Sequence, residues 1–276
     1  MELLKLVRRR SFLSEVIYVC LNVALALLLL ASIAFTQSIV IGLILVLVSK
    51  WRVFAVRPRF WFANVQANLV DVIVGVSFVL NLYAIDNAGL STKGAWIGMG
   101  LLTLLYIGWL LFLKPRSKRA YMVAQAGVAL FVGVMTLYSV SYEWPVSIVV
   151  LGMWLIGFAT ARHTLSSYDG EDYLLLLAMS WGVALAEIGW LAYHWTIAYT
   201  LPFASNLVVP QIAILAIMLA FVAHRAYDSF YHHQKIRSGD VLMPIIFVVS
   251  MTIVLLVFLP LILCHSIDCT SFIIGS

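Results

Sequence analysis

The sequence contains few charged residues. Asp, Glu, Lys and Arg make up 11% of the 276 residues, whereas 64% are hydrophobic. A soluble domain usually has about a quarter charged residues, because its surface must be wetted by water. So little charge excludes an ordinary soluble protein and indicates a polytopic membrane protein that forms one compact bundle.

Several catalytic motifs are also missing. The chain has no HExxH, no GxSxG and no P-loop, which argues against an intramembrane metalloprotease, a serine hydrolase and a P-loop nucleotidase. The six lysines, at positions 5, 50, 93, 114, 118 and 235, lie outside the predicted spans or at their ends, so none suits a retinal Schiff base. The connecting loops are too short to hold a soluble domain. The sequence implies no cofactor, and the absence of these motifs favours a protein that is not an enzyme.

What the sequence does contain is a series of apolar segments. A hydrocarbon core of about 30 Å requires about 20 apolar residues in a helix. The sequence predicts an all-α bundle of nine transmembrane helices: 12–34, 38–55, 62–84, 95–113, 120–140, 145–163, 173–195, 206–226 and 241–263. Lys50 and Arg52 shorten the apolar part of the second segment, which is alternatively half of a tight hairpin with the first span.

The basic residues predict an orientation. If the nine spans alternate in direction, all of the 17 Lys and Arg residues except Lys93 lie on one side. The positive-inside rule then places the N-terminus in the cytoplasm and the C-terminus outside. With its short loops, the chain is expected in a prokaryotic plasma membrane. A cleaved signal peptide at the first span is the alternative, and it would leave eight spans with the same orientation.

Basic and aromatic residues alternate between the second and third spans, in the segment 50–61. This pattern favours anionic lipid head groups as partners of Lys50, Arg52, Arg57 and Arg59, and argues against nucleic acid. Cys264 and Cys269, on the predicted outer side, form a disulfide only if that compartment is oxidising.

The seventh span holds an acid. Glu187 lies about 21 Å from the start of this span at 1.5 Å per residue, and a central charged residue costs about 2.5–3.5 kcal/mol on insertion. It should therefore face protein or water. Ser180 and His194 share its helical face, with His194 about 10.5 Å further along the axis.

The third span repeats this pattern, because Asn64, Asn68 and Asp71 lie on one face. The two acidic spans run in the same direction, four helices apart, which would fit a parallel internal repeat of a transporter. The alternative is that both acids are neutral structural groups that hydrogen-bond to neighbouring helices.

A third polar group follows the eighth span. His224, Asp228 and His232 recur every four residues, a spacing that would place three metal ligands on one helical face. The alternative is an ordinary solvated stretch at the membrane rim.

The sequence predicts small-molecule or proton-coupled transport, with Glu187 and Asp71 as proton or substrate groups, Asn64, Asn68 and Ser180 beside them, and His194 as an outer relay. One alternative is a non-catalytic subunit or scaffold that binds lipid or partner helices, in a homo-oligomer or a membrane complex. The other is a membrane enzyme that acts on lipid head groups through the His224–Asp228–His232 face.

Overall fold

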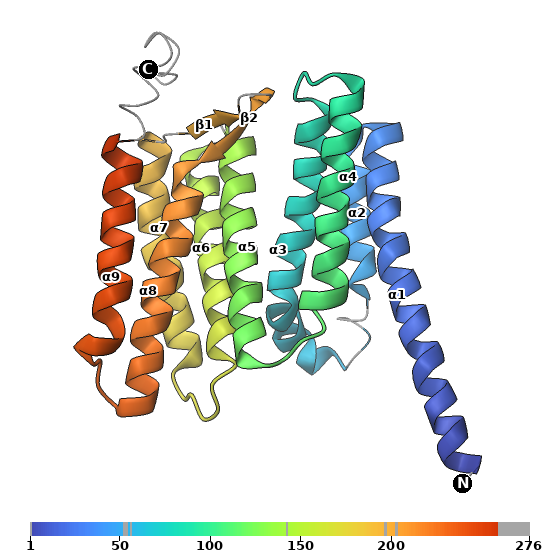
Figure 1. Cartoon of the computed structure of the whole chain (residues 1–276), viewed down its shortest axis with the longest axis horizontal. Helices are drawn as coiled ribbons and strands as arrows, with labels where there is room; N and C mark the ends of the chain where they lie inside the picture. The colour runs from blue at the N-terminus through green and yellow to red at the C-terminus, as the bar shows by residue number, and fades with distance from the viewer. Residues whose placement is uncertain are drawn as a thin grey trace. The chain divides into compact units, whose positions relative to one another are not determined.

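The computed structural model describes residues 2–51, 55, 57–141, 143–195, 198–201 and 204–258 (Figure 1). Within these residues the helices are α1 (Glu2–Thr36), α2 (Ile39–Ser49), α3 (Trp61–Asp86), α4 (Thr92–Gly108), α5 (Arg119–Val140), α6 (Val146–Leu165), α7 (Leu174–His194), α8 (Gln211–His233) and α9 (Ser238–Ile253). Shorter turns are η2 (Pro58–Phe60), and the π-helical η3 (Trp109–Leu113) and η4 (Val254–Phe258).

Eight helices of the described residues are long and apolar enough to cross a membrane, and α2 is a shorter apolar helix. The predicted all-α, multi-pass membrane fold is therefore confirmed. The side of the membrane on which each terminus lies stays a prediction.

The chain divides into two compact units, Met1–Pro210 and Gln211–Ser276. The first unit contains α1 to α7 and a two-stranded hairpin, and the second contains α8, α9 and η4. In the first unit, consecutive helices are neighbours from α1 to α4, and α5, α6 and α7 follow one another in the same way (Figure 1).

A β-hairpin before α8 changes the predicted start of the eighth span. Strands β1 (Ala198–Leu201) and β2 (Ala204–Pro210) pair antiparallel, with Tyr199 opposite Val209. The eighth span was predicted from residue 206, but α8 begins only at Gln211. Pro210 has no backbone N–H and suits the end of a strand, and Ser139 Oγ of α5 lies 3.3 Å from the Val208 carbonyl oxygen. Cys264 and Cys269 lie outside the described residues.

Helix α2 is short: it begins at Ile39 and already ends at Ser49. Gln37 has a positive φ of 51° after α1, and α2 ends before Lys50, so this apolar helix is shorter than the predicted second span. Its 11 residues measure about 16 Å, roughly half of the hydrocarbon thickness. A Cβ added at Gly42 would lie only 2.7 Å from Val79 Cγ1, so α2 packs closely on α3 at this glycine.

The core of the first unit is apolar and continuous through α1 to α4. Leu29, Val79, Leu82, Met99 and Leu110 are at most 1% exposed. Helices α6 and α7 approach through small residues: a Cβ at Gly182 would lie 3.0 Å from the Trp154 carbonyl oxygen. Such close approach is how helices associate in lipid.

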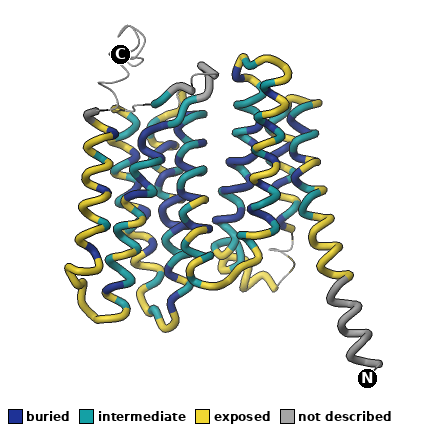
Figure 2. Tube along the Cα trace, viewed as in Figure 1, coloured by how far each residue is buried: buried dark blue, intermediate teal, exposed yellow. Residues whose placement is uncertain are grey.

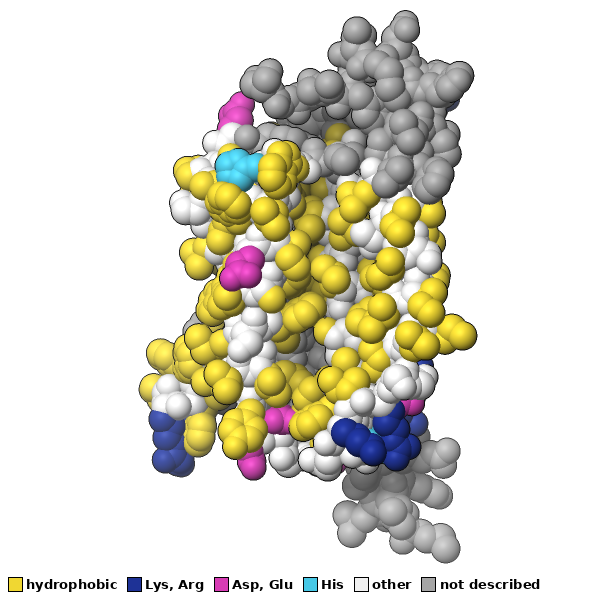
Figure 3. Space-filling view, turned by 90° about the vertical axis from the view of Figure 1, so that its left-hand side faces the viewer, with side chains coloured by type: hydrophobic (Ala, Val, Ile, Leu, Met, Phe, Trp, Pro, Cys, Tyr) yellow, Lys and Arg dark blue, Asp and Glu magenta, His cyan; other side chains and the backbone are white. Residues whose placement is uncertain are grey.

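The described helices bury the faces they turn toward one another and leave the others exposed (Figure 2). Hydrophobic side chains cover most of the face drawn in Figure 3, as expected where lipid tails surround the helices.

Candidate functional site

Three charged residues meet inside the first unit, and we call them the Asp71 cluster: Asp71, Lys50 and Lys114. Asp71 is ten residues into α3, about 15 Å from the helix start. Lys50 Nζ forms an ion pair with Asp71 Oδ2, and Lys114 Nζ lies 2.8 Å from the same oxygen. The side chain of Lys50 is 9% exposed and that of Lys114 is 32% exposed, so one ammonium is enclosed and the other is partly open.

Each lysine comes from the end of a different helix. Lys50 caps α2, and its backbone N–H donates to the Leu47 carbonyl. Lys114 follows η3, and its backbone N–H donates to the Trp109 carbonyl at 2.9 Å, the five-residue step of a π-helical turn. Because α2 and α4–η3 both stop at the level of Asp71, they deliver two cations to one carboxylate. Isolated π-helical turns are frequent at functional sites.

Two aromatic residues, one of α4 and one of η3, lie near the carboxylate of Asp71. Trp109 Nε1 lies 3.4 Å from Asp71 Oδ1, a long hydrogen bond. Tyr106 stacks on Phe78 with ring centroids 4.1 Å apart, and a Cβ at Gly75 would lie 3.4 Å from Tyr106 Oη. Gly75 is one helical turn after Asp71, so this hydroxyl lies about one turn from the carboxylate.

Tyr106 Oη is the one buried side-chain polar atom of the described residues that has no hydrogen-bond partner. A buried donor without an acceptor costs about 1–3 kcal/mol. The position therefore suits an acceptor that the described side chains do not supply.

Gln125 of α5 holds the segment that carries Lys114. Its Nε2 donates to the carbonyl oxygens of Leu113 at 2.6 Å and Arg116 at 2.8 Å. Its Oε1 lies 2.7 Å from His163 Nε2 of α6. An amide oxygen only accepts, so this imidazole nitrogen donates. The chain of contacts runs from α6 through α5 to the end of η3, and it fixes the position from which Lys114 reaches Asp71.

The electrostatics of the Asp71 cluster are unbalanced, because two lysines face one carboxylate. Burial lowers the pKa of the Lys50 ammonium, Asp71 opposes this effect, and repulsion from Lys114 adds to it. With both lysines charged, the cluster carries one surplus positive charge.

The predicted polar face of the third span is present on α3. Asn68 Nδ2 donates to the Asn64 carbonyl oxygen at 2.8 Å, and both side chains are partly buried. Asp71 is therefore the member of this face that reaches across to other helices through ion pairs.

Glu187 is in a different environment. It is exposed on α7, as are Ser180 and His194 on the same face, while Gly182 and Gly189 are buried on the opposite face. His194 contacts the rings of Trp190 and Tyr193 at centroid distances of 4.9 and 5.5 Å. Glu187 has no hydrogen bond or ion pair within the described part of the chain, so the structure does not bring it together with His194.

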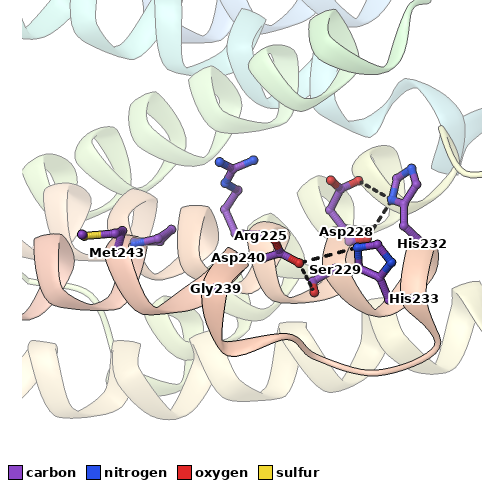
Figure 4. Close-up of a pocket in the computed structure, with 9 residues that line it drawn as sticks. Arg225, Asp228, Ser229, His232, His233, Gly239, Asp240 and Met243 are labelled. Atoms are coloured by element: carbon purple, nitrogen blue, oxygen red, sulfur yellow. Dashed lines mark hydrogen bonds and ion pairs between the residues drawn. The ribbon is translucent and has the colours of Figure 1, made fainter.

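The second unit has a pocket of about 440 Å³ between the end of α8 and the start of α9 (Figure 4). Ser229 Oγ donates to Asp240 Oδ2 at 2.7 Å, and His232 Nδ1 lies 2.8 Å from the Asp228 carbonyl oxygen. Asp228 and His232 line the pocket, but His224 does not. No group of three His, Cys, Asp or Glu side chains that could hold a metal ion occurs among the described residues. The predicted metal site thus stays a prediction, with no cluster to support it.

The basic segment after α2 divides into two environments. Lys50 is buried in the Asp71 cluster, so its ammonium does not lie on the surface where a head group would meet it. Arg57 and Arg59 are exposed, and Arg52 lies outside the described residues. The expected lipid contact is therefore best offered by the two described arginines.

Comparison of the chain with family models, with curated proteins and with solved structures finds no match. The candidate site therefore depends on its own geometry. Sequence reasoning found Asp71 but missed its partners. Lys50 and Lys114 have the appearance of ordinary rim lysines, and a useful signal would have been that Lys50 interrupts an apolar run after only 11 helical residues.

Proposed function

We propose that this multi-pass membrane protein transports a small molecule, and that Asp71 is the residue that couples binding to movement. The supporting observation is that one carboxylate within a membrane-spanning helix is held by two ammonium groups from the ends of two other helices. A ligand or a proton that takes the place of one partner changes the electrostatic contact between α3 and α2 or η3. Ionisable groups at this depth commonly mark ion and substrate pathways.

The exchange of ion-pair partners gives a simple coupling scheme. While Lys114 is paired with Asp71, the end of η3 is drawn toward α3. When a ligand binds Lys114, or when a proton neutralises Asp71, that attraction is lost and the segment held by Gln125 can shift. A ligand shifts a two-state equilibrium only by its difference in affinity for the two states.

Transport is tested with the purified full chain in proteoliposomes on a solid-supported membrane, with sodium salts, organic anions, organic cations and proton gradients applied in turn. We expect at least one gradient to drive a current that Asp71→Asn abolishes. Asp86→Asn, at the other end of α3, is the matched control and should leave the current unchanged. Equal currents from Asp71→Asn and the wild type would remove Asp71 from the mechanism.

A second candidate function, a subunit or scaffold that binds partner helices, is favoured by the exposure of Glu187. An exposed acid near the middle of an apolar helix costs about 2.5–3.5 kcal/mol if it faces lipid. A polar group on a neighbouring helix would offset that cost. Cysteine at Ser180, in a cysteine-free background, should then form cross-links in native membranes that Glu187→Leu reduces. If a cysteine at Ser180 cross-links no more than a cysteine at Leu175, the result argues against a role in binding partner helices.

A further inference from the structure

We infer that the ligand of the Asp71 cluster is an oxyanion, a molecule that presents a phosphate or carboxylate group to Lys50 and Lys114. This inference deepens the proposed transport function and depends on it only for the identification of the ligand as a substrate. Binding itself follows from the charges and donors of the cluster.

The charges of the Asp71 cluster do not balance. Two lysines share one carboxylate oxygen, and Lys50 is almost fully enclosed. The one carboxylate cannot balance both ammonium groups, and a partly buried cluster with a surplus charge is unfavourable. A bound anion supplies the missing negative charge, and Lys114 is open enough to admit one.

The Asp71 cluster is rich in hydrogen-bond donors. Each ammonium has three N–H donors and no acceptor, and Trp109 adds an indole donor. The side chains of the cluster offer a single carboxylate as acceptor. Tyr106 Oη, buried one turn from Asp71, adds an unused hydroxyl. Donors therefore exceed acceptors, which is the composition of a site for an acceptor-rich group such as a phosphate.

Lys114 is the most accessible member of the Asp71 cluster. Lys114 follows the π-helical turn η3 at the end of the bundle that also carries Arg57 and Arg59, both exposed. Exposed positive charge at this end raises the local concentration of anions. An oxyanion can then reach the partly open Lys114, where it competes with Asp71.

The inference is tested by binding, without any measurement of transport. The full chain is placed in nanodiscs of zwitterionic lipid, and sodium phosphate or sodium acetate is titrated at constant ionic strength. Tryptophan fluorescence reports both the unfolding temperature and any local change at Trp109. The Trp109→Phe variant identifies the local change, because it lacks the Trp109 signal. We expect a saturable rise in unfolding temperature that Lys114→Gln abolishes and that Lys118→Gln, in the same loop, retains.

Asp71→Asn distinguishes a binding site from a merely structural ion pair. Removing the competing carboxylate should tighten oxyanion binding about tenfold, the size of one charged hydrogen bond. Lys114→Arg preserves the charge and should still bind the anion. It is the variant to test if Lys114→Gln does not fold.

A second set of nanodiscs that contain acidic phospholipid separates the two sources of such a group. If only the acidic lipid stabilises the wild type, and Lys114→Gln loses that effect, the oxyanion belongs to a lipid head group. The inference is overturned if neither soluble anions nor acidic lipid produce a saturable shift, or if wild type and Lys114→Gln shift equally. Currents driven by cations in the transport experiment, together with no anion binding, would reject the oxyanion and leave transport standing.

Discussion

Asp71 on α3 and Glu187 on α7 are both single acids inside long apolar helices, and the structure treats them in opposite ways. Asp71 is buried and held by two lysines, whereas Glu187 is exposed and has no ion pair in the described residues. An apolar position in the sequence is therefore a poor guide to the environment of an acid. The partners of Asp71 come from the ends of helices distant in sequence.

Removing each acid should give the largest contrast between the two regions. Asp71→Ala leaves two lysines without a counter-charge and should lower the free energy of unfolding by about 3 kcal/mol. Glu187→Gln changes an exposed side chain and should stay within about 0.5 kcal/mol. Unfolding in SDS, followed by tryptophan fluorescence, compares the two variants. Equal losses would mean that the partners of Asp71 do not matter.

A contrast within α7 sharpens the comparison. Gly182→Ala places a Cβ about 3 Å from the backbone oxygen of Trp154, which cannot move aside easily, and should cost about 1–3 kcal/mol through overpacking. Ser180→Ala, on the exposed face of the same helix, is the control and should have little effect. The same unfolding assay measures both, and a neutral Gly182→Ala would contradict the close α6–α7 contact.

Two tyrosines extend the comparison to hydroxyl groups. Tyr138 Oη donates to the Gly189 carbonyl oxygen at 2.6 Å, so Tyr138→Phe should cost about 1 kcal/mol. Tyr106 Oη has no partner in the described residues, so Tyr106→Phe should be neutral or stabilising when no anion is added. If Tyr106→Phe is the more damaging of the two in thermal unfolding, the hydroxyl has an acceptor in the membrane.

The smallest expected effect is the dependence on pH that Lys50 of the Asp71 cluster contributes. Burial lowers the pKa of Lys50, so between that lowered value and the ordinary 10.5 the unfolded chain holds a proton that the folded chain releases. The free energy of unfolding should rise with pH over this window. Chemical unfolding at several alkaline pH values should show the rise in the wild type and in Glu187→Gln, but a smaller rise in Lys50→Met.

The sequence predicts the helical membrane fold well because hydropathy depends on local composition. It predicts the candidate site poorly, because a site depends on which helix ends meet. Asp71 stands out in an apolar run, but in the sequence Lys114 resembles Lys118. Only the π-helical turn before Lys114 and the hydrogen bonds of Gln125 to this segment direct Lys114 inward. Glu187 stands out equally, although the helical spacing of Ala178, Gly182, Leu185 and Gly189 marks the opposite face of α7 as the buried one.

The shortness of α2 has a consequence for the surrounding bilayer. Its outward residues, among them Ile44 and Leu47, are exposed, yet the helix covers only about half of a hydrocarbon layer of about 30 Å. Lipid beside α2 must become thinner there or admit water. We therefore expect this adjustment of the bilayer to be local to α2, because the eight longer helices of the described residues are long enough to cross a hydrocarbon layer of about 30 Å.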